Sequence, residues 1–367
     1  MRLAIYILIL FLSNINLLVA KTFISQDITQ NQYWTQQKSP YIITNDITIH
    51  AHVILNIQAG TEIQFSSGVT LYVEGSIWAV GKSKKPIIWH GFQDNNWNGI
   101  VFRKGKEKNN IDTTINVFRY CQFEGKDYIP AQLILAEARH IEMENCKIQA
   151  CQTALQSEKS GYIYFKKSKI NQVYKAFHIC TTSSMKIEQC KIENFVLMLV
   201  NGSLDFKFNK INKSIARGQH TGLVIWLIGG GSVVIENNEF KQAAEAAFTL
   251  YKSVRKSNIQ VANNQFKKNK IHIALSCQYA NKGDFKLKDN TFYKSRNTPI
   301  LILDDCIESI DTISLSPNYF VGLQMPKQAH KLKIEHENNS VNNPQRLILE
   351  FEGFLKEKPK FTPLKKI

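Results

Sequence analysis

Adjacent carboxylates at Asp304 and Asp305 are the residues of this sequence best suited to catalysis. Hydrolysis of a glycosidic bond uses two carboxyl groups, one as general acid and one that activates water or attacks the sugar. His220, within Gly218-Gln219-His220-Thr221-Gly222, is a further candidate acid or base. The competing interpretation is an aspartate pair that ends a strand at a turn, and we favour it. These three residues are therefore the ones to test, although we expect no catalytic site.

A second chemistry, β-elimination from a sugar acid, needs a basic side chain and often a Ca²⁺ ion held by several carboxylates. Asp127, Glu137, Glu142 and Glu144 are grouped in the sequence, but their spacing does not place three on one outward strand face. A metal-free lyase that uses lysine or arginine stays open. The histidines follow no ligand spacing such as HxxxH, and no two cysteines form a CxxC pair. We therefore expect no metal and no cofactor.

The net charge of +16 comes from basic residues spread along the chain. Such a surface favours anionic partners such as acidic glycans, membranes or cell walls, although a solvated lysine-rich surface is the competing interpretation. Nucleic acid would suit the charge but not the export signal that residues 1–20 predict. Five tryptophans and thirteen tyrosines offer rings that stack on sugars, but most alternate with apolar residues as core positions do.

Residues 1–20 have the pattern of a signal peptide, with Arg2 followed by an apolar run and a cleavage site after Ala20. An uncleaved membrane anchor is the alternative, weakened by Asn14 and Asn16 within the apolar stretch. No later segment is long enough to cross a bilayer, so we expect a secreted, extracellular protein with no membrane span after cleavage. In a eukaryotic source, three sequons would be glycosylation candidates. They begin at Asn201, Asn212 and Asn338.

An internal repeat runs through most of the chain. Its template is two apolar residues in alternation, then a small or polar residue, then another apolar residue, as in Ile141, Met143, Cys146 and Ile148. The small or polar member stands at Cys121, Cys146, Ser168, Cys190, Asn209, Asn238, Asn264, Asn290 and Asn318. Consecutive positions are about 20 to 30 residues apart in the sequence, a spacing that is typical of one coil of a β-solenoid.

Stacking of coils explains the residue types of the template. Coils lie about 4.8 Å apart, so equivalent side chains form columns through the stack. An asparagine at an inward bend can bond to the backbone and to the next asparagine of its column, and we predict this for Asn264. The near-continuous apolar strands that follow each bend, such as Leu223 to Ile228, predict burial on both faces or an exposed apolar stripe.

The cysteines follow the same columns. Cys121 and Cys146 occupy one column on successive coils and are close enough to bridge, whereas Cys146 and Cys190 are two coils apart, roughly 9.6 Å. We predict that Cys190 is a free, buried thiol. The sequence holds seven cysteines, so at least one has no partner within the chain, and the pairing stays open.

Two resemblances support this architecture. Residues Ser39 to Phe102, with Leu55-x-Ile57-x-Ala59-Gly60-Thr61 and Trp97-x-Gly99-Ile100-x-Phe102, resemble the repeat module of bark beetle-type cell-junction proteins. The repeat after it resembles the pectin lyase-like superfamily. Both imply a right-handed β-helix and an extracellular place, but no enzyme. Ala59 stands where the module usually has proline, and this chain lacks the scavenger-receptor modules and membrane span of the junction proteins.

We therefore predict an all-β fold, a single-stranded right-handed parallel β-helix (solenoid) of roughly ten or more coils. Residues 1–20 are the signal peptide, 21–40 an N-terminal cap, 41–350 the β-helix and 351–367 a basic C-terminal tail. The predicted function is non-catalytic: a basic surface for adhesion or for binding anionic glycans. The alternative is a polysaccharide lyase or glycoside hydrolase acting on acidic polysaccharide. The oligomeric state stays open.

Overall fold

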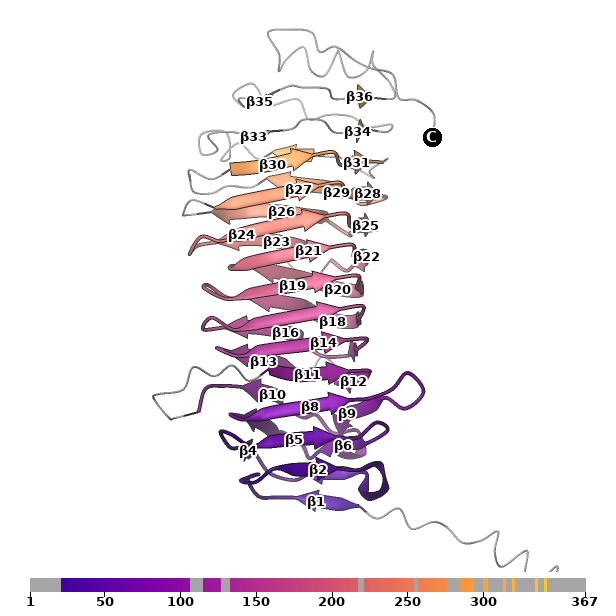
Figure 1. Ribbon diagram of the computed structural model, residues 1–367. Helices are drawn as coiled ribbons and strands as arrows, with labels where there is room; N and C mark the ends of the chain where they lie inside the picture. The colour runs from indigo at the N-terminus through magenta and orange to yellow at the C-terminus, as the bar shows by residue number, and fades with distance from the viewer. Residues whose placement is uncertain are drawn as a thin grey trace, which may run out of the picture.

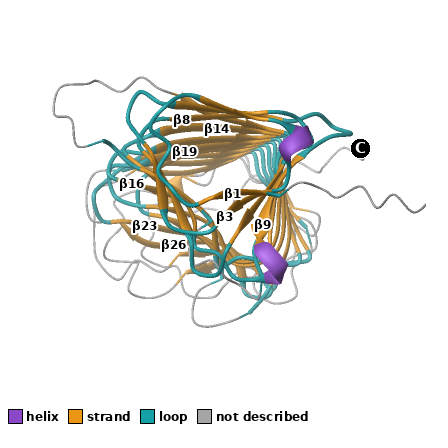
Figure 2. Cartoon of the chain, turned by 90° about the horizontal axis from the view of Figure 1, so that it is seen from below, coloured by secondary structure: helices purple, strands orange, loops and turns teal. Residues whose placement is uncertain are grey.

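The computed structural model shows a parallel β-solenoid whose coils stack along one axis (Figure 1). Seen along that axis, the strands form three walls around a filled interior (Figure 2). The structure describes residues 21–105, 115–126, 133–216, 221–253, 257–275, 284–293, 300–302, 313–314, 319–320, 334–335 and 340–341. The predicted signal peptide and the predicted tail at 351–367 lie outside these residues. The described strands confirm the predicted all-β parallel solenoid.

One wall is a sheet of thirteen parallel strands, here called the long sheet. Its strands are β2 (Gln32–Trp34), β5 (Ile54–Ile57), β8 (Ser76–Val80), β11 (Ile115–Arg119), β14 (His140–Glu144), β17 (Tyr162–Lys166), β19 (Ser184–Glu188), β21 (Ser203–Lys207), β24 (Ser232–Glu236), β27 (Asn258–Ala262), β30 (Asp284–Lys288), β33 (Ile313–Ser314) and β35 (Ile334–Glu335).

After each long-sheet strand the chain bends into a second wall, the bend row. Its strands are β1 (Thr22–Ile24), β3 (Tyr41–Ile43), β6 (Glu62–Phe65), β9 (Ile87–Gly91), β12 (Cys121–Glu124), β15 (Lys147–Gln149), β22 (Lys210–Ser214), β25 (Glu239–Lys241), β28 (Gln265–Lys267), β31 (Thr291–Phe292), β34 (Tyr319–Phe320) and β36 (Ser340–Val341). Two short 3₁₀ helices, η1 (Gln36–Lys38) and η2 (Phe92–Asp94), lie in the first coils.

A third wall, the return row, carries the chain back toward the long sheet. Its strands are β4 (Ile47–Ile49), β7 (Thr70–Val73), β10 (Gly99–Phe102), β13 (Ile134–Glu137), β16 (Thr153–Glu158), β23 (Gly222–Leu227), β26 (Ala246–Ser253), β29 (Ile271–Leu275) and β32 (Ile300–Ile302). The longer strands β18 (Lys169–Ile179) and β20 (Lys191–Val200) run through both rows, which therefore form one sheet. Among the described residues, no helix is long and apolar enough to cross a membrane.

Alternation along the long sheet builds the core. In β14, Ile141 and Met143 point inward between half-buried neighbours. They lie in register with Ile163 and Phe165 of the next coil. Because strand side chains alternate between the two faces, one face of every coil adds apolar surface to the same column. The buried residues consequently form one hydrophobic cluster.

The bend after each long-sheet strand has a repeated backbone conformation. In the described coils, the residue before the small or polar member of the repeat has a positive φ. These residues are Tyr120, Asn145, Lys167, Gln189, Phe208, Asn237, Asn263 and Asp289, with φ between 48° and 58°. This left-handed conformation turns the strand direction sharply and resets the alternation, so that the next residue, Asn264 for example, points inward.

Asparagines at the bends form a buried ladder. The Oδ1 atom of Asn264 accepts hydrogen bonds from the backbone N–H and the Nδ2 of Asn238, at 2.9 and 3.0 Å. Its Nδ2 donates to the carbonyl of Ile235 at 2.8 Å and to Oδ1 of Asn290 at 3.0 Å. Asn209 bonds to Asn238 in the same way. The prediction that Asn264 is an inward residue bonded to backbone is confirmed.

Thiols occupy the same column in earlier coils. Cys121 and Cys146 follow one another in adjacent coils, and both are free, as are the described Cys151, Cys180 and Cys190. The predicted free and buried state of Cys190 is confirmed. Burial raises the pKa of the Cys190 thiol to about 12, since a thiolate would lose its hydration there. The buried thiols among them, Cys121, Cys146, Cys151 and Cys190, serve as small core residues, whereas Cys180 is half-buried.

The outer side of the return row is buried at some positions and half-buried at others, such as Tyr72 and Val101. Leu135 of β13, Val224 of β23 and Thr249 of β26 all point away from the core, yet each is at most 8% exposed. Of the two alternatives for these strands, burial on both faces is therefore correct at these positions. The described part of this wall presents no apolar stripe there.

A buried histidine in the return row should make the fold sensitive to acid. Nδ1 of His272 lies 3.0 Å from Nδ2 of Asn269, and its Nε2 faces the carbonyl of Tyr293. Burial lowers the pKa of His272 to about 4, although the hydrogen bond to Tyr293 opposes this. The unfolded chain, with a histidine pKa of about 6.5, then binds more protons between these two values, so stability falls as the pH falls through this window.

We expect the free energy of unfolding to drop by about 2 kcal/mol between pH 7.5 and pH 5 because of His272. Urea denaturation at both pH values measures the drop, and His272→Gln should remove most of it. The same drop in His272→Gln as in the wild type would assign it to other groups. His178, whose pKa is also lowered by burial and by Lys175, is the first of these to test.

Candidate functional site

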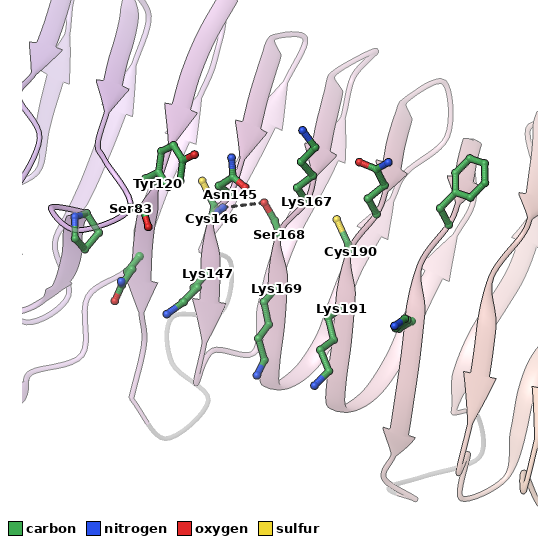
Figure 3. Close-up of a pocket in the computed structure, with 15 residues that line it drawn as sticks. Ser83, Tyr120, Asn145, Cys146, Lys147, Lys167, Ser168, Lys169, Cys190 and Lys191 are labelled. Carbon is green, nitrogen blue, oxygen red and sulfur yellow. Dashed lines mark hydrogen bonds between the residues drawn. The ribbon is translucent and has the colours of Figure 1, made fainter.

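A groove runs along the bends between the long sheet and the bend row, with a volume of about 650 Å³ (Figure 3). Its floor consists of the ladder residues Cys146, Ser168 and Cys190. Ser168 fixes the floor, because its Oγ accepts a hydrogen bond from the backbone N–H of Cys146 at 2.8 Å. The groove is lined by lysines on both sides of this floor. They are Lys147, Lys167, Lys169, Lys191 and Lys210, and we call the feature the lysine groove.

Four of these lysines form one column. Lys147, Lys169, Lys191 and Lys210 are register partners on four consecutive coils. Each stands directly after a ladder residue, so the bend gives all four the same outward orientation. Figure 3 shows Lys147, Lys169 and Lys191 pointing to the same side of the groove. Neighbouring members of this lysine column are separated along the solenoid axis by about 4.8 Å, the spacing of the strands.

The column keeps most of its positive charge. The carboxylate of Glu193 lies beside the column. Its Oε2 atom is 3.3 Å from Nζ of Lys169 and 2.9 Å from Nζ of Lys191. Partial burial raises the pKa of Glu193, but hydrogen bonds from Lys191, Asn212 and Lys169 outweigh this and hold it below its usual value. Glu193 thus stays ionised and one carboxylate serves two ammonium groups. Within the described residues, Lys147 and Lys210 have no ion-pair partner.

The opposite rim comes from the left-handed bend residues. Tyr120, Asn145, Lys167, Gln189 and Phe208 project there because a positive φ turns each side chain outward between two strands. Phe208 is 56% exposed, which is unusual for a phenylalanine in a strand-rich wall. The rim therefore offers two aromatic rings and two amides opposite a row of ammonium groups. Such a lining suits a ligand that carries both anionic groups and hydroxyls.

Carboxylates on the outer face of the long sheet are paired with cations. Glu188 accepts a hydrogen bond from the Tyr164 hydroxyl and lies 3.2 Å from Lys186 and 3.6 Å from Lys166. Burial raises its pKa, but the bonds from Tyr164 and Lys186 outweigh this, so the pKa is lowered overall. A carboxyl group held ionised in this way is a poor general acid near neutral pH.

The acidic residues considered for Ca²⁺ lie apart. Glu142 and Glu144 both point outward from β14, whereas Glu137 ends β13 in the return row. Asp127 lies outside the described residues. In the part of the chain that the structure describes, no three His, Cys, Asp or Glu side chains are arranged to hold a metal ion.

The catalytic candidates Asp304, Asp305 and His220 lie outside the described residues, as does the sequon residue Asn338. Of the other two glycosylation candidates, Asn201 is partly engaged, since its Oδ1 accepts a hydrogen bond from the backbone N–H of Ile228 at 2.9 Å. Nδ2 of Asn212 lies 3.4 Å from Glu193 at the edge of the lysine column.

Sequence analysis did not identify the lysine column, although a signal for it was present. In four successive copies of the repeat, lysine follows the ladder residue directly. The residues that directly follow the ladder residues point outward on successive coils, so their types predict an outward column of lysines. The net charge alone carried no information on where the lysines gather.

Residues 131–320 match the protein family described as right handed beta helix region. No curated protein and no solved structure matches the chain. The family match begins after the N-terminal segment Ser39 to Phe102, for which the junction-protein resemblance stays a prediction. The match covers more than half of the chain and agrees with the stacked parallel coils, so this chain belongs to the right-handed β-helix family.

Proposed function

We propose that this protein is an extracellular β-helix that binds an acidic polysaccharide along the lysine groove and does not cleave it. The observation that supports this most is the register of Lys147, Lys169, Lys191 and Lys210 on consecutive coils. A column of cations parallel to the solenoid axis suits an extended polymer whose negative charges recur along its length. A compact anion would meet only one or two of these lysines.

Two features favour a polysaccharide over other polyanions. The groove rim carries amides at Asn145 and Gln189, which suit hydroxyl groups. The signal-like residues 1–20 favour an extracellular place, where nucleic acid is not the expected partner. Adhesion through cell-surface or wall glycans would follow from the same contact.

The wild-type protein tests this proposal on immobilised polygalacturonate and on a neutral polysaccharide of similar length. We expect retention on the acidic polymer only, with loss of retention as salt rises, because exposed charges are screened within about 8 Å at physiological ionic strength. The same incubation is assayed for new reducing or unsaturated ends, of which we expect none. Retention on the acidic polymer that does not decrease as the salt concentration rises would contradict the proposal. New ends abolished by Asp304→Asn or Asp305→Asn would replace it with the enzyme alternative.

A further inference from the structure

A second hollow, of about 440 Å³, lies on the outer face of the long sheet in the first coils. Two aromatic rings line it, and both are accessible: Tyr33 is 62% exposed and Trp78 is 50% exposed. Other tryptophans in these coils, Trp34 and Trp89, are buried in the core. The two accessible rings are thus set apart from the structural aromatics by their outward position in the strand alternation.

Register places the two rings on alternate coils. Tyr33 of β2 pairs with Asn56 of β5, and Asn56 pairs with Trp78 of β8. The backbones that carry the rings are therefore about 9.6 Å apart, two strand spacings. Asn56, a short amide, lies between them and leaves the space over the middle coil open. Two rings with a polar gap form a platform for alternate units of an extended chain rather than for one flat ligand.

The polar lining of this hollow is held in position. Oε1 of Gln58 accepts a hydrogen bond from the backbone N–H of Gln36 at 3.0 Å. Oε1 of Gln36 in turn accepts one from Nζ of Lys85 at 3.3 Å. Lys82 also lines the hollow, and none of its described lining residues is acidic. The hollow therefore combines aromatic faces, fixed amides and two cations.

We propose that this hollow, the aromatic hollow, is a binding site for acidic sugar units. Tyr33 and Trp78 would stack on the apolar faces of two pyranose rings, because C–H groups on a ring face are attracted to the negative face of an aromatic system. The amide of Asn56 would bond the hydroxyls between them. Lys82 and Lys85 would face a carboxylate or sulfate. A phosphate polymer has the charge but no ring to stack.

One loop connects this hollow to the lysine groove. Lys82 and Lys85 line the hollow, whereas Ser83 and Pro86 line the groove. Paired backbone hydrogen bonds between Lys82 and Lys85, at 3.0 and 2.9 Å, hold the loop as a tight hairpin between the two. The idea that one polysaccharide occupies both sites rests on the proposed function. The binding of a short oligosaccharide in the hollow does not depend on it.

Two probes separate the sites in the full chain: a short oligogalacturonate and inorganic polyphosphate, each titrated by calorimetry with tryptophan fluorescence as second readout. We expect Trp78→Ala to weaken oligogalacturonate binding about tenfold or more and Trp78→Phe to restore most of it. Polyphosphate binding should be unchanged in both variants. Phe23→Ala, which removes an aromatic ring that is 61% exposed on β1, is the control and should bind both probes normally.

The inference would be overturned if Trp78→Ala bound oligogalacturonate with the affinity of the wild type. It would also be overturned if this variant lost affinity for oligogalacturonate and for polyphosphate equally. Melting curves check that each variant is folded, and Tyr33→Ala gives a second, independent variant of the platform. A different result would show that the proposed function fails while this inference holds. In that case the wild type would bind the short oligogalacturonate in a Trp78-dependent way, but its binding of long acidic polysaccharide and of polyphosphate would not depend on the lysine column.

Discussion

Replacing Lys147, Lys169, Lys191 and Lys210 together by glutamine should weaken binding of acidic polysaccharide about 30- to 1000-fold at low salt. The range follows from about 0.5–1 kcal/mol for each exposed charge contact, or about 2–4 kcal/mol for four. The side chains are exposed or half-buried and glutamine is also polar, so the fold should be retained. Binding isotherms at several salt concentrations measure the effect, and the variant should also show a flatter dependence on salt.

A matched control removes the same charge elsewhere. Lys21, Lys104, Lys213 and Lys268 are exposed and line neither the lysine groove nor the aromatic hollow. Their joint replacement by glutamine should change affinity only a few-fold, through the overall field of the protein. Equal losses in the two variants would show that net charge, and not the lysine column, determines binding.

Replacing Asn264 by leucine should lower the free energy of unfolding by about 2–6 kcal/mol. The substitution leaves the backbone N–H of Asn238 and the carbonyl of Ile235 without their present partners inside the core. Each buried polar group left unpaired costs about 1–3 kcal/mol. Because every coil rests on its neighbours, we expect the loss to affect the unfolding of the adjacent coils as well. Chemical denaturation, with hydrogen exchange to locate the loss, measures both effects.

Serine at the same position is the control. Ser168 occupies this column naturally, and its Oγ bonds the backbone N–H of Cys146 at 2.8 Å as the asparagine oxygens do for their neighbours. Asn264→Ser should therefore keep a partner for Asn238 and cost clearly less than Asn264→Leu. If leucine were tolerated as well as serine, the ladder bonds would contribute little and simple packing would explain the repeat.

The ladder was predictable from sequence because its geometry is local and repeats. An inward residue after each alternating pair, as at Asn264, has to satisfy backbone groups at a bend, and few residue types fit there. The left-handed conformation that makes the bend was not predictable, because it falls on residues as different as Tyr120, Phe208 and Asn237. Stacking of coils imposes that conformation on them, and local preference alone would not.

Exposure of the aromatic residues also depended on tertiary structure. Trp78 and Trp89 both lie in alternating, strand-like segments, yet one is outward and half-exposed while the other is buried. The difference depends on which side of the nearest bend each residue falls, since each bend resets the alternation. The sequence alone therefore identified aromatic residues that could stack on a sugar, but it did not distinguish Tyr33 and Trp78, which lie together on the surface, from the buried ones.

The sequence by itself determined the coil repeat, the inward column from Cys121 to Asn290 and the parallel solenoid, because each depends on a pattern that recurs within every coil. Only the tertiary structure decided where the charge and the rings gather. The register between coils aligned Lys147 with Lys210 and Tyr33 with Trp78, pairs that are far apart in the chain. Coil lengths differ, so these columns are set by hydrogen bonding between strands and not by any fixed interval in the sequence.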